Sequence, residues 1–262
     1  MYRWSDYYKE MISRNIGVIT EEEQEILKNS TVAIAGSGGM GGLSALWLCQ
    51  IGIGGLKIAD FDKFEISNIN RQFYACQSTL GKNKSEAIGS LLLDMNPELN
   101  LEIYNKGVIK DNVEEFVSGT NAVIDGIDYT NLEASLNLHH SARMNNLYVF
   151  YAVAIGFGAN LFIFAPDGMT LEEYIGFNGN DDLKSYKIPI EKFCPVIPSY
   201  IDSKIVQKAA TGEIIIPNIG LAQAIGTGMM VGEVILRILD KRRPVIIPKY
   251  ISFDVLDYRF NI

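Results

Sequence analysis

The chain has 262 residues, of which 48% are hydrophobic and 21% charged, and its formal net charge is -8. This length and composition suit a globular domain whose core is large enough to need no disulfides. An acidic chain lacks the clustered basic residues that nucleic acid requires, so we expect no nucleic-acid partner. The three cysteines form no CxxC pair. This spacing indicates a reducing, cytoplasmic setting and a chain that binds no zinc.

Two apolar runs are long enough, or nearly so, to be considered as membrane spans. Glycines and Asn160 interrupt the first, residues 147–165, which is rich in aromatic and β-branched residues. It predicts two buried strands joined by a glycine turn. Proline and charged residues break the second run, residues 214–239, and predict a buried helix. With no apolar signal core at the N-terminus, we expect neither a membrane segment nor a secretory leader.

The first 30 residues predict a helical arm. Thr20 followed by Glu23 forms the sequence pattern of a capping box, in which each side chain satisfies the other's backbone N–H. We expect this helix to end near Asn29. A strand at 31–35, a glycine turn and a helix at 41–51 then lead to a strand at 56–60, which together make a βαβ unit.

The same alternation continues along the chain. Further expected elements are helices at 82–94, 112–117 and 129–144, and strands at 101–104, 122–125 and 147–152. Such alternation predicts an α/β fold with a Rossmann-like, mostly parallel sheet and helices on both faces.

We divide this single domain into four parts. After the arm (1–30) come a nucleotide-binding core (31–165), a loop-rich insertion (166–217), and a C-terminal part (218–262). The last part should contain a long helix at 220–239 and antiparallel edge strands within 250–260.

A glycine-rich loop follows the strand at 31–35 and opens a helix. Its glycines are Gly36, Gly38, Gly39 and Gly41. Glycine lets the backbone approach phosphate oxygens, and the helix N-terminus offers free N–H donors. Asp60 ends the next strand, where an acid that binds ribose hydroxyls is expected. These features alone favour an NAD(P)-dependent oxidoreductase.

Charged motifs downstream favour ATP instead. Residues 60–62 read D-x-D, residues 67–72 read S-N-x-x-R-Q, and residues 81–84 read G-x-x-K. Another aspartate, Asp128, follows the strand at 122–125. Basic residues near phosphates, together with a carboxylate left to hold a metal, suit ATP with Mg²⁺ better than a dinucleotide.

These motifs, in this order, resemble the adenylation domain of the ThiF, MoeB and HesA family, which is related to ubiquitin-activating enzymes. The resemblance runs from residue 12 to 165 and returns more weakly over 218–239. It implies that Gly39 and its neighbours hold phosphate and that Asp60 binds the ribose. By the same resemblance, Asn68 and Arg71 contact the phosphates and Lys84 neutralises the region of the α-phosphate.

Other roles follow from the same resemblance. Asp128 would hold Mg²⁺, and Arg14 would reach across a homodimer interface into the partner's site. The sequence departs from the family pattern at Asn15, where glutamine is usual, and at Tyr129, where asparagine is usual. We expect Asp62 to be a capping or turn residue, and Asp125, at a strand end, to support the site without contacting the ligand. The adjacent histidines at 139 and 140 cannot both face one site on a helix, so we expect one to be exposed and the other partly buried.

Some relatives pass the activated acyl group to a cysteine. Cys194 is the candidate here for such a thioester, although no histidine or arginine stands beside it in the sequence to lower its pKa, and a structural role is favoured. We expect Cys49 to lie in the core, and Cys76 is a candidate to line the site.

The resemblance therefore implies a function. We expect an ATP- and Mg²⁺-dependent adenylyltransferase that activates a C-terminal carboxylate of a ubiquitin-like protein or ribosomal peptide and releases pyrophosphate. A tRNA-linked amino acid is a further acceptor in the family, and the acidic charge disfavours it. Two alternatives remain open: a non-catalytic partner subunit of an activating enzyme, and an NAD(P)-dependent oxidoreductase.

Overall fold

A single mixed sheet organises the protein in the computed structural model, which describes residues 2–179, 182–183, 186–211, 213–214 and 216–262. Within these residues the sheet has eight strands in the order β3-β2-β1-β4-β5-β6-β7-β8. Strands β1 to β5 run parallel, and β5 to β8 pair antiparallel. The strands are β1 (Thr31–Ala35), β2 (Gly55–Ala59), β3 (Asn100–Tyr104), β4 (Ala122–Asp125), β5 (Val149–Ile155), β6 (Gly158–Phe164), β7 (Ile251–Asp254) and β8 (Arg259–Asn261). The expected α/β fold with a mostly parallel sheet and antiparallel C-terminal strands is confirmed.

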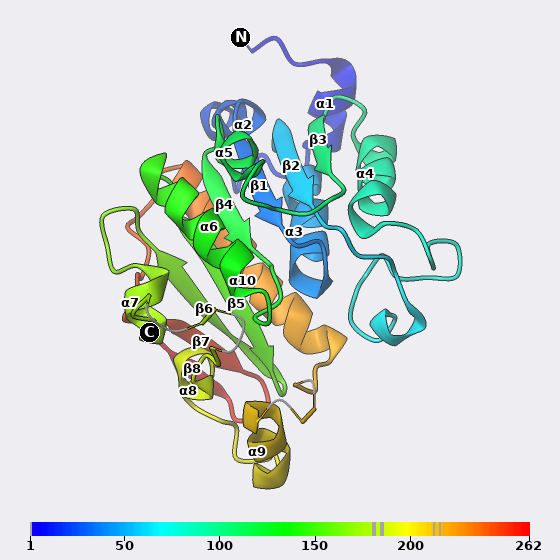
Figure 1. The fold of residues 1–262 in the computed structure, drawn as a ribbon. Helices are drawn as coiled ribbons and strands as arrows, with labels where there is room; N and C mark the ends of the chain where they lie inside the picture. Colours follow the sequence, from blue (N-terminus) through cyan, green and yellow to red (C-terminus); the bar gives the residue numbers. More distant parts are fainter. Residues whose placement is uncertain (1, 180–181, 184–185, 212, 215) are drawn as a thin grey trace.

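Helices cover both faces of this sheet (Figure 1). The side chains of β1 alternate between two apolar clusters: Val32 and Ile34 join one, and Ala33 and Ala35 join the other. The first cluster includes residues of α3 (Gly39–Gln50), α4 (Lys84–Met95) and α10 (Gly220–Ile238). The second includes residues of α5 (Val113–Val117), α6 (Leu132–Met144) and α7 (Leu171–Ile175). A strand buried on both faces is typical of a doubly wound sheet.

The helical arm packs at the amino ends of the strands. It contains α1 (Asp6–Met11), which we did not predict, and α2 (Glu21–Lys28), which begins with the expected capping box between Thr20 and Glu23. The Leu27 carbonyl accepts from Gly54 N–H at 3.0 Å, next to the start of β2. The arm therefore lies at the end of the sheet opposite the carboxyl ends of the parallel strands.

The two apolar runs fold as expected. Residues 147–165 form β5 and β6, joined at Gly156, whose φ of 58° requires a left-handed backbone. The second run contains α10, which is long and apolar enough to cross a membrane by length and composition. Its residues Ala222, Met230 and Val234 are buried in the core cluster around β1. This packing on the sheet accounts for its apolar character.

The insertion is more helical than we predicted, as far as the structure describes it. It contains α7, α8 (Ile190–Phe193) and α9 (Ser203–Thr211); residues 180–181, 184–185, 212 and 215 of the predicted loop lie outside the described part. The expected start of α6 at residue 129 was wrong by one turn. The Asp128 carboxylate accepts from the backbone and hydroxyl of Thr130, and this local turn delays the helix to Leu132.

Candidate functional site

The carboxyl ends of three neighbouring strands meet at one edge of the sheet. Ala35 of β1 pairs with Ala59 of β2 and with Asp125 of β4, and these three residues are the last of their strands. The loops that follow them therefore lie side by side, as in other open parallel sheets that bind ligands. Asp125 also pairs with Tyr151 of β5, which continues to Ile155. A cleft of about 490 Å³ opens there. Among the expected site residues, its lining includes Gly36, Gly38, Gly39, Asp60, Arg71, Lys84 and Asp128.

The glycine loop is shaped by close backbone approaches. Gly36 has a φ of 85°, and a side chain there would overlap the backbone of Gly126 in the loop after β4. A side chain at Gly41 would overlap the Gly36 carbonyl oxygen. Gly38 stands at the N-cap of α3 without a side-chain hydrogen bond to the helix. The first N–H groups of α3 therefore face the cleft region uncapped, as anion binding at a helix N-terminus requires.

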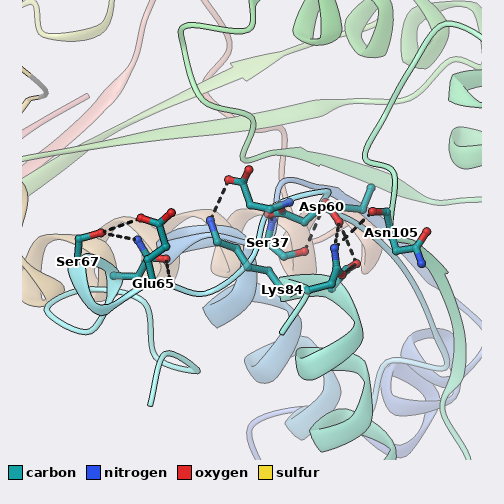
Figure 2. A network of polar contacts seen from close by, with 11 residues as sticks. Ser37, Asp60, Glu65, Ser67, Lys84 and Asn105 are labelled. Atoms are coloured by element: carbon teal, nitrogen blue, oxygen red, sulfur yellow. Dashed lines mark hydrogen bonds and ion pairs between the residues drawn. The ribbon is translucent and has the colours of Figure 1, made fainter. Parts of the chain in front are cut away.

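Asp60 joins this loop to the end of β2 (Figure 2). Its Oδ2 accepts from Ser37 N–H at 2.7 Å, and its Oδ1 accepts from Asp62 N–H at 2.8 Å. Burial raises the pKa of the Asp60 carboxyl, while these two backbone donors and nearby Lys84 act in the opposite direction. The carboxylate thus orders the loop and still lines the cleft, where its expected contact with ribose stays a prediction.

Lys84 reaches into the cleft from the first turn of α4. Its Nζ lies 3.0 Å from Asp62 Oδ2, and only 8% of its side chain is exposed. Asn83 caps the helix by accepting from Glu86 N–H at 3.1 Å, and this cap fixes where Lys84 leaves the backbone. Asp62, which we expected to be a capping or turn residue, is instead the partner of this ammonium group. Its side chain is 53% exposed.

The structure separates two residues that the sequence motif grouped together. Arg71 lines the cleft, and its Nη1 donates to Ser67 O at 3.0 Å and to Asn70 Oδ1 at 2.9 Å. Asn68 is not among the cleft residues: its Oδ1 accepts from Glu65 N–H at 3.1 Å, across the short 3-10 helix η1 (Ile66–Asn68). In this arrangement Asn68 shapes the turn that carries Arg71.

Asp128 lies on the β4 side of the cleft. Its Oδ1 accepts from Thr130 N–H at 3.0 Å and from the Thr130 hydroxyl at 2.8 Å, and Asp128 is exposed. Within the described residues, no three histidine, cysteine or acidic side chains are grouped as a metal cage. Mg²⁺ at nucleotide sites takes one or two carboxylates and completes its shell with phosphate oxygens and water. Asp128, with a free oxygen at the cleft, fits that requirement.

Arg14 does not reach this cleft within its own chain. Its neighbour Asn15 donates to the Ile51 carbonyl at 3.0 Å, just beyond the C-terminus of α3. The glycine loop lies at the other end of this 12-residue helix, about 18 Å away. The Arg14 side chain is exposed.

The cysteines occupy different environments. Cys194 is 2% exposed, and burial raises its pKa to about 12, so this thiol is protonated near neutral pH in this arrangement. Cys49 lies in the core, as expected. Cys76 is exposed and does not line the cleft; hydrogen bonds to the hydroxyls of Ser78 and Thr79 lower its pKa to about 7.

Three further residues line the cleft that we did not predict as site residues: Gln72, Asn218 and Gln223. Gln72 and Gln223 line the cleft beside the glycine loop, and a side chain at Gly39 would collide with that of Gln223. Asn218 lies just before α10, and its backbone carbonyl accepts from Asn70 Nδ2 at 3.0 Å. The glutamine of the S-N-x-x-R-Q motif and the returning resemblance at 218–239 were the available signals for these positions.

Comparisons with known proteins agree with this geometry. The model of the ThiF family matches residues 12–262. The chain is 29% identical over 162 residues to a SAMP-activating enzyme E1 of Haloferax volcanii, which covers 62% of this chain and 58% of that protein. It is 38% identical over 117 residues to a tRNA threonylcarbamoyladenosine dehydratase of Bacillus subtilis, which covers 44% of this chain and 46% of that protein. These matches thus span about half the length of each relative.

The fold has counterparts among solved structures. The crystal structure of E. coli MccB with ATP superposes with a TM-score of 0.73 at 20% identity, covering 98% of this chain and 72% of that one. At this level of identity the likeness concerns the fold. Since the family model covers nearly the whole sequence, including every strand of the sheet and the glycine loop, this chain belongs to the ThiF family.

Proposed function

We propose that this chain binds ATP with Mg²⁺ in the cleft and adenylates a carboxylate, releasing pyrophosphate. The observation that carries the proposal is the convergence of Lys84, Arg71 and Asp128 around the glycine loop. A dinucleotide carries two phosphate charges and needs no metal, whereas ATP carries about four and normally arrives with Mg²⁺. Two fixed cations and a spare carboxylate suit the triphosphate.

In the proposed reaction the protein forms no covalent bond. An oxygen of the substrate carboxylate bonds to the α-phosphorus of ATP as the bond to the pyrophosphate oxygen breaks. Negative charge builds on the α-phosphate oxygens, and the cleft offers Lys84 and Arg71 to stabilise it. The N-terminus of α3 adds backbone N–H donors. Mg²⁺ supplies further charge neutralisation when bound, and Asp128 is the side chain that would hold it.

We propose that the Asp62 carboxylate holds the Lys84 ammonium in place before the nucleotide binds. The pair is 3.0 Å apart, with the lysine buried and the carboxylate about half exposed. A buried ammonium without a partner is costly, so the carboxylate stabilises the charge before a nucleotide binds. Incoming phosphate oxygens can take over this contact without moving the helix.

The substrate that we propose is the C-terminal carboxylate of a small protein or peptide. The SAMP-activating relative supports this class, and we infer that this chain acts in the cytoplasm on a partner of that kind. The dehydratase relative raises a tRNA-linked substrate as the alternative. The net charge of -8 favours the peptide, because tRNA binding depends on clustered cations.

The test is exchange of labelled pyrophosphate into ATP by the purified protein with Mg²⁺. Candidate carrier proteins and peptides are compared with the same chains carrying a C-terminal amide. We expect exchange with free carboxylates and none with amides. Absence of exchange with every candidate, together with tight binding to a known activating subunit, would instead support the non-catalytic partner. The retention of Arg71, Lys84 and Asp128 disfavours that reading.

We further propose that the working form is a homodimer in which Arg14 completes the partner's cleft. The position of Arg14 at the far end of α3 supports this, since the side chain is exposed and cannot serve its own site. Mixing Arg14→Ala with Lys84→Met chains tests it. Because one mixed cleft then has both groups intact, activity should return to a fraction of the wild-type value. A mixture as inactive as its components, or a fully active monomer, would refute the arrangement.

A further inference from the structure

A buried carboxylate and imidazole lie beneath the loop that carries Asp128. Asp125 ends β4 and His139 lies on α6; the Oδ2 and Nε2 atoms are 3.1 Å apart. The two residues are 2% and 7% exposed. Within the described part of the chain, His139 is the basic side chain paired with this carboxylate. A buried carboxylate needs such a partner, since its charge is costly without one.

The other oxygen of Asp125 shapes the loop above it. Oδ1 accepts from Ile127 N–H at 3.0 Å, one residue before Asp128. Gly126 N–H donates to the Ala35 carbonyl at 2.7 Å, which joins the same turn to the end of β1 and the glycine loop. The hydrogen bonds therefore form a continuous path from His139 through Asp125 to the backbone that presents Asp128.

His139 is itself held by packing. Its ring meets the Phe164 ring edge to face, with centroids 4.7 Å apart. Tyr151 is partly buried and pairs with Asp125 across the sheet; burial and, after it, the charge of Asp125 raise the pKa of the tyrosine. The outer side of His139 borders a second cavity of about 400 Å³, away from the proposed ATP cleft. The imidazole is thus fixed in position but does not touch the cleft where the nucleotide would bind.

We infer that His139 is a positioning residue: it holds Asp125 in the orientation that orders the turn at 126–128 and so sets where Asp128 meets the metal and triphosphate. The inference rests on the proposed function for its last step, the contact between Asp128 and Mg²⁺. The step that concerns the turn depends on this chain alone. Residues that orient metal-binding groups in this way typically change metal affinity or activity 10- to 100-fold, by order of magnitude, when they are replaced.

Matched variants separate positioning from packing. His139→Phe keeps an aromatic ring beside Phe164 and removes the N–H donor. His139→Gln places an amide N–H near the original Nε2 and should restore the contact. His140→Ala is the control, because His140 is the exposed neighbour on the same helix.

Two readouts are compared. The first is hydrogen–deuterium exchange of the 126–131 segment in the protein without nucleotide or metal. The second is the Mg²⁺ concentration for half-maximal pyrophosphate exchange, measured beside the affinity for ATP without Mg²⁺. For His139→Phe we expect faster hydrogen exchange in the segment and a half-saturating Mg²⁺ concentration about 10- to 100-fold higher. Metal-free ATP affinity should stay within about twofold of wild type. His139→Gln should restore most of the wild-type hydrogen exchange and Mg²⁺ dependence, and His140→Ala should match wild type in both.

If His139→Phe showed the wild-type rate of hydrogen exchange in the 126–131 segment and the wild-type Mg²⁺ dependence, the inference would be overturned. Equal damage in the phenylalanine and glutamine variants would also overturn it, since this would indicate packing alone. If the phenylalanine variant does not fold, His139→Asn repeats the test, because its amide is too short to reach Asp125 Oδ2. A wild-type protein that shows no pyrophosphate exchange would refute the proposed function, while hydrogen exchange would still decide the role of His139 in the turn.

Discussion

Replacing Lys84 with methionine removes one charge from the cleft and little else. Methionine retains most of the aliphatic stem, so the packing of the buried side chain is largely kept. The lysine is 8% exposed, and in such shielded sites the loss of one group that stabilises a transition state costs about 2.7–4 kcal/mol. We therefore expect kcat for adenylation to fall about 10²- to 10³-fold.

The same substitution should hardly change the stability of the fold. Asp62 loses its partner, but its side chain is 53% exposed, and ion pairs with exposed members contribute about 0–1 kcal/mol. The assay is pyrophosphate exchange with thermal unfolding measured in parallel. Lys82→Met is the matched control, because Lys82 is exposed and lies outside the cleft lining. A Lys84→Met variant with the kcat of the control would refute the role of this ammonium group in charge stabilisation.

Three further predictions concern the metal, the loop and the thiols. Asp128→Ala should abolish Mg²⁺-dependent turnover and leave the unfolding temperature unchanged, because an exposed carboxylate after a strand does not hold the core; undiminished turnover would remove it from the mechanism. Gly41→Ala forces a Cβ against the Gly36 carbonyl, so it should lower the free energy of unfolding by about 1–3 kcal/mol and remove most of the nucleotide affinity. The control is Gly232→Ala in α10, where the space is open; denaturant unfolding should show it to be neutral or stabilising. Alkylation of the native protein should modify Cys76 alone, at a rate that rises with its thiolate fraction as pH passes about 7, and modification of Cys194 at a similar rate would contradict its burial.

Much of the fold was predictable because its signals are local. The capping box at Thr20, the glycine loop after β1 and the apolar hairpin of β5 and β6 each depend on residues close together in the chain. The order of strands and helices then follows from their alternation and from the handedness of βαβ connections. The short helix α8 was not predicted because four residues carry too little periodicity, whereas α7 was not predicted although a capping box between Thr170 and Glu173 marks its start.

The candidate site was predictable only as a set of residue types. The pairing of Lys84 with Asp62 joins residues 22 positions apart, and that of His139 with Asp125 joins residues 14 apart. In each pair one residue ends or follows a strand and the other lies on a helix, so both pairs depend on how these elements meet at the sheet edge. Asn68 is a different case: its motif predicts a contact with phosphate, which stays a prediction, and in the structure its amide oxygen accepts from a nearby backbone N–H.

Nucleotide binding by calorimetry tests the central claim most directly. ATP with Mg²⁺, ATP alone, NAD⁺ and NADP⁺ are titrated separately into the purified wild-type protein and into Asp128→Ala. We expect wild type to bind ATP, more tightly with Mg²⁺ than without it, and to bind neither dinucleotide; the variant should lose the gain from Mg²⁺. Binding of a dinucleotide but not of ATP would contradict the account and identify the glycine loop as that of an oxidoreductase.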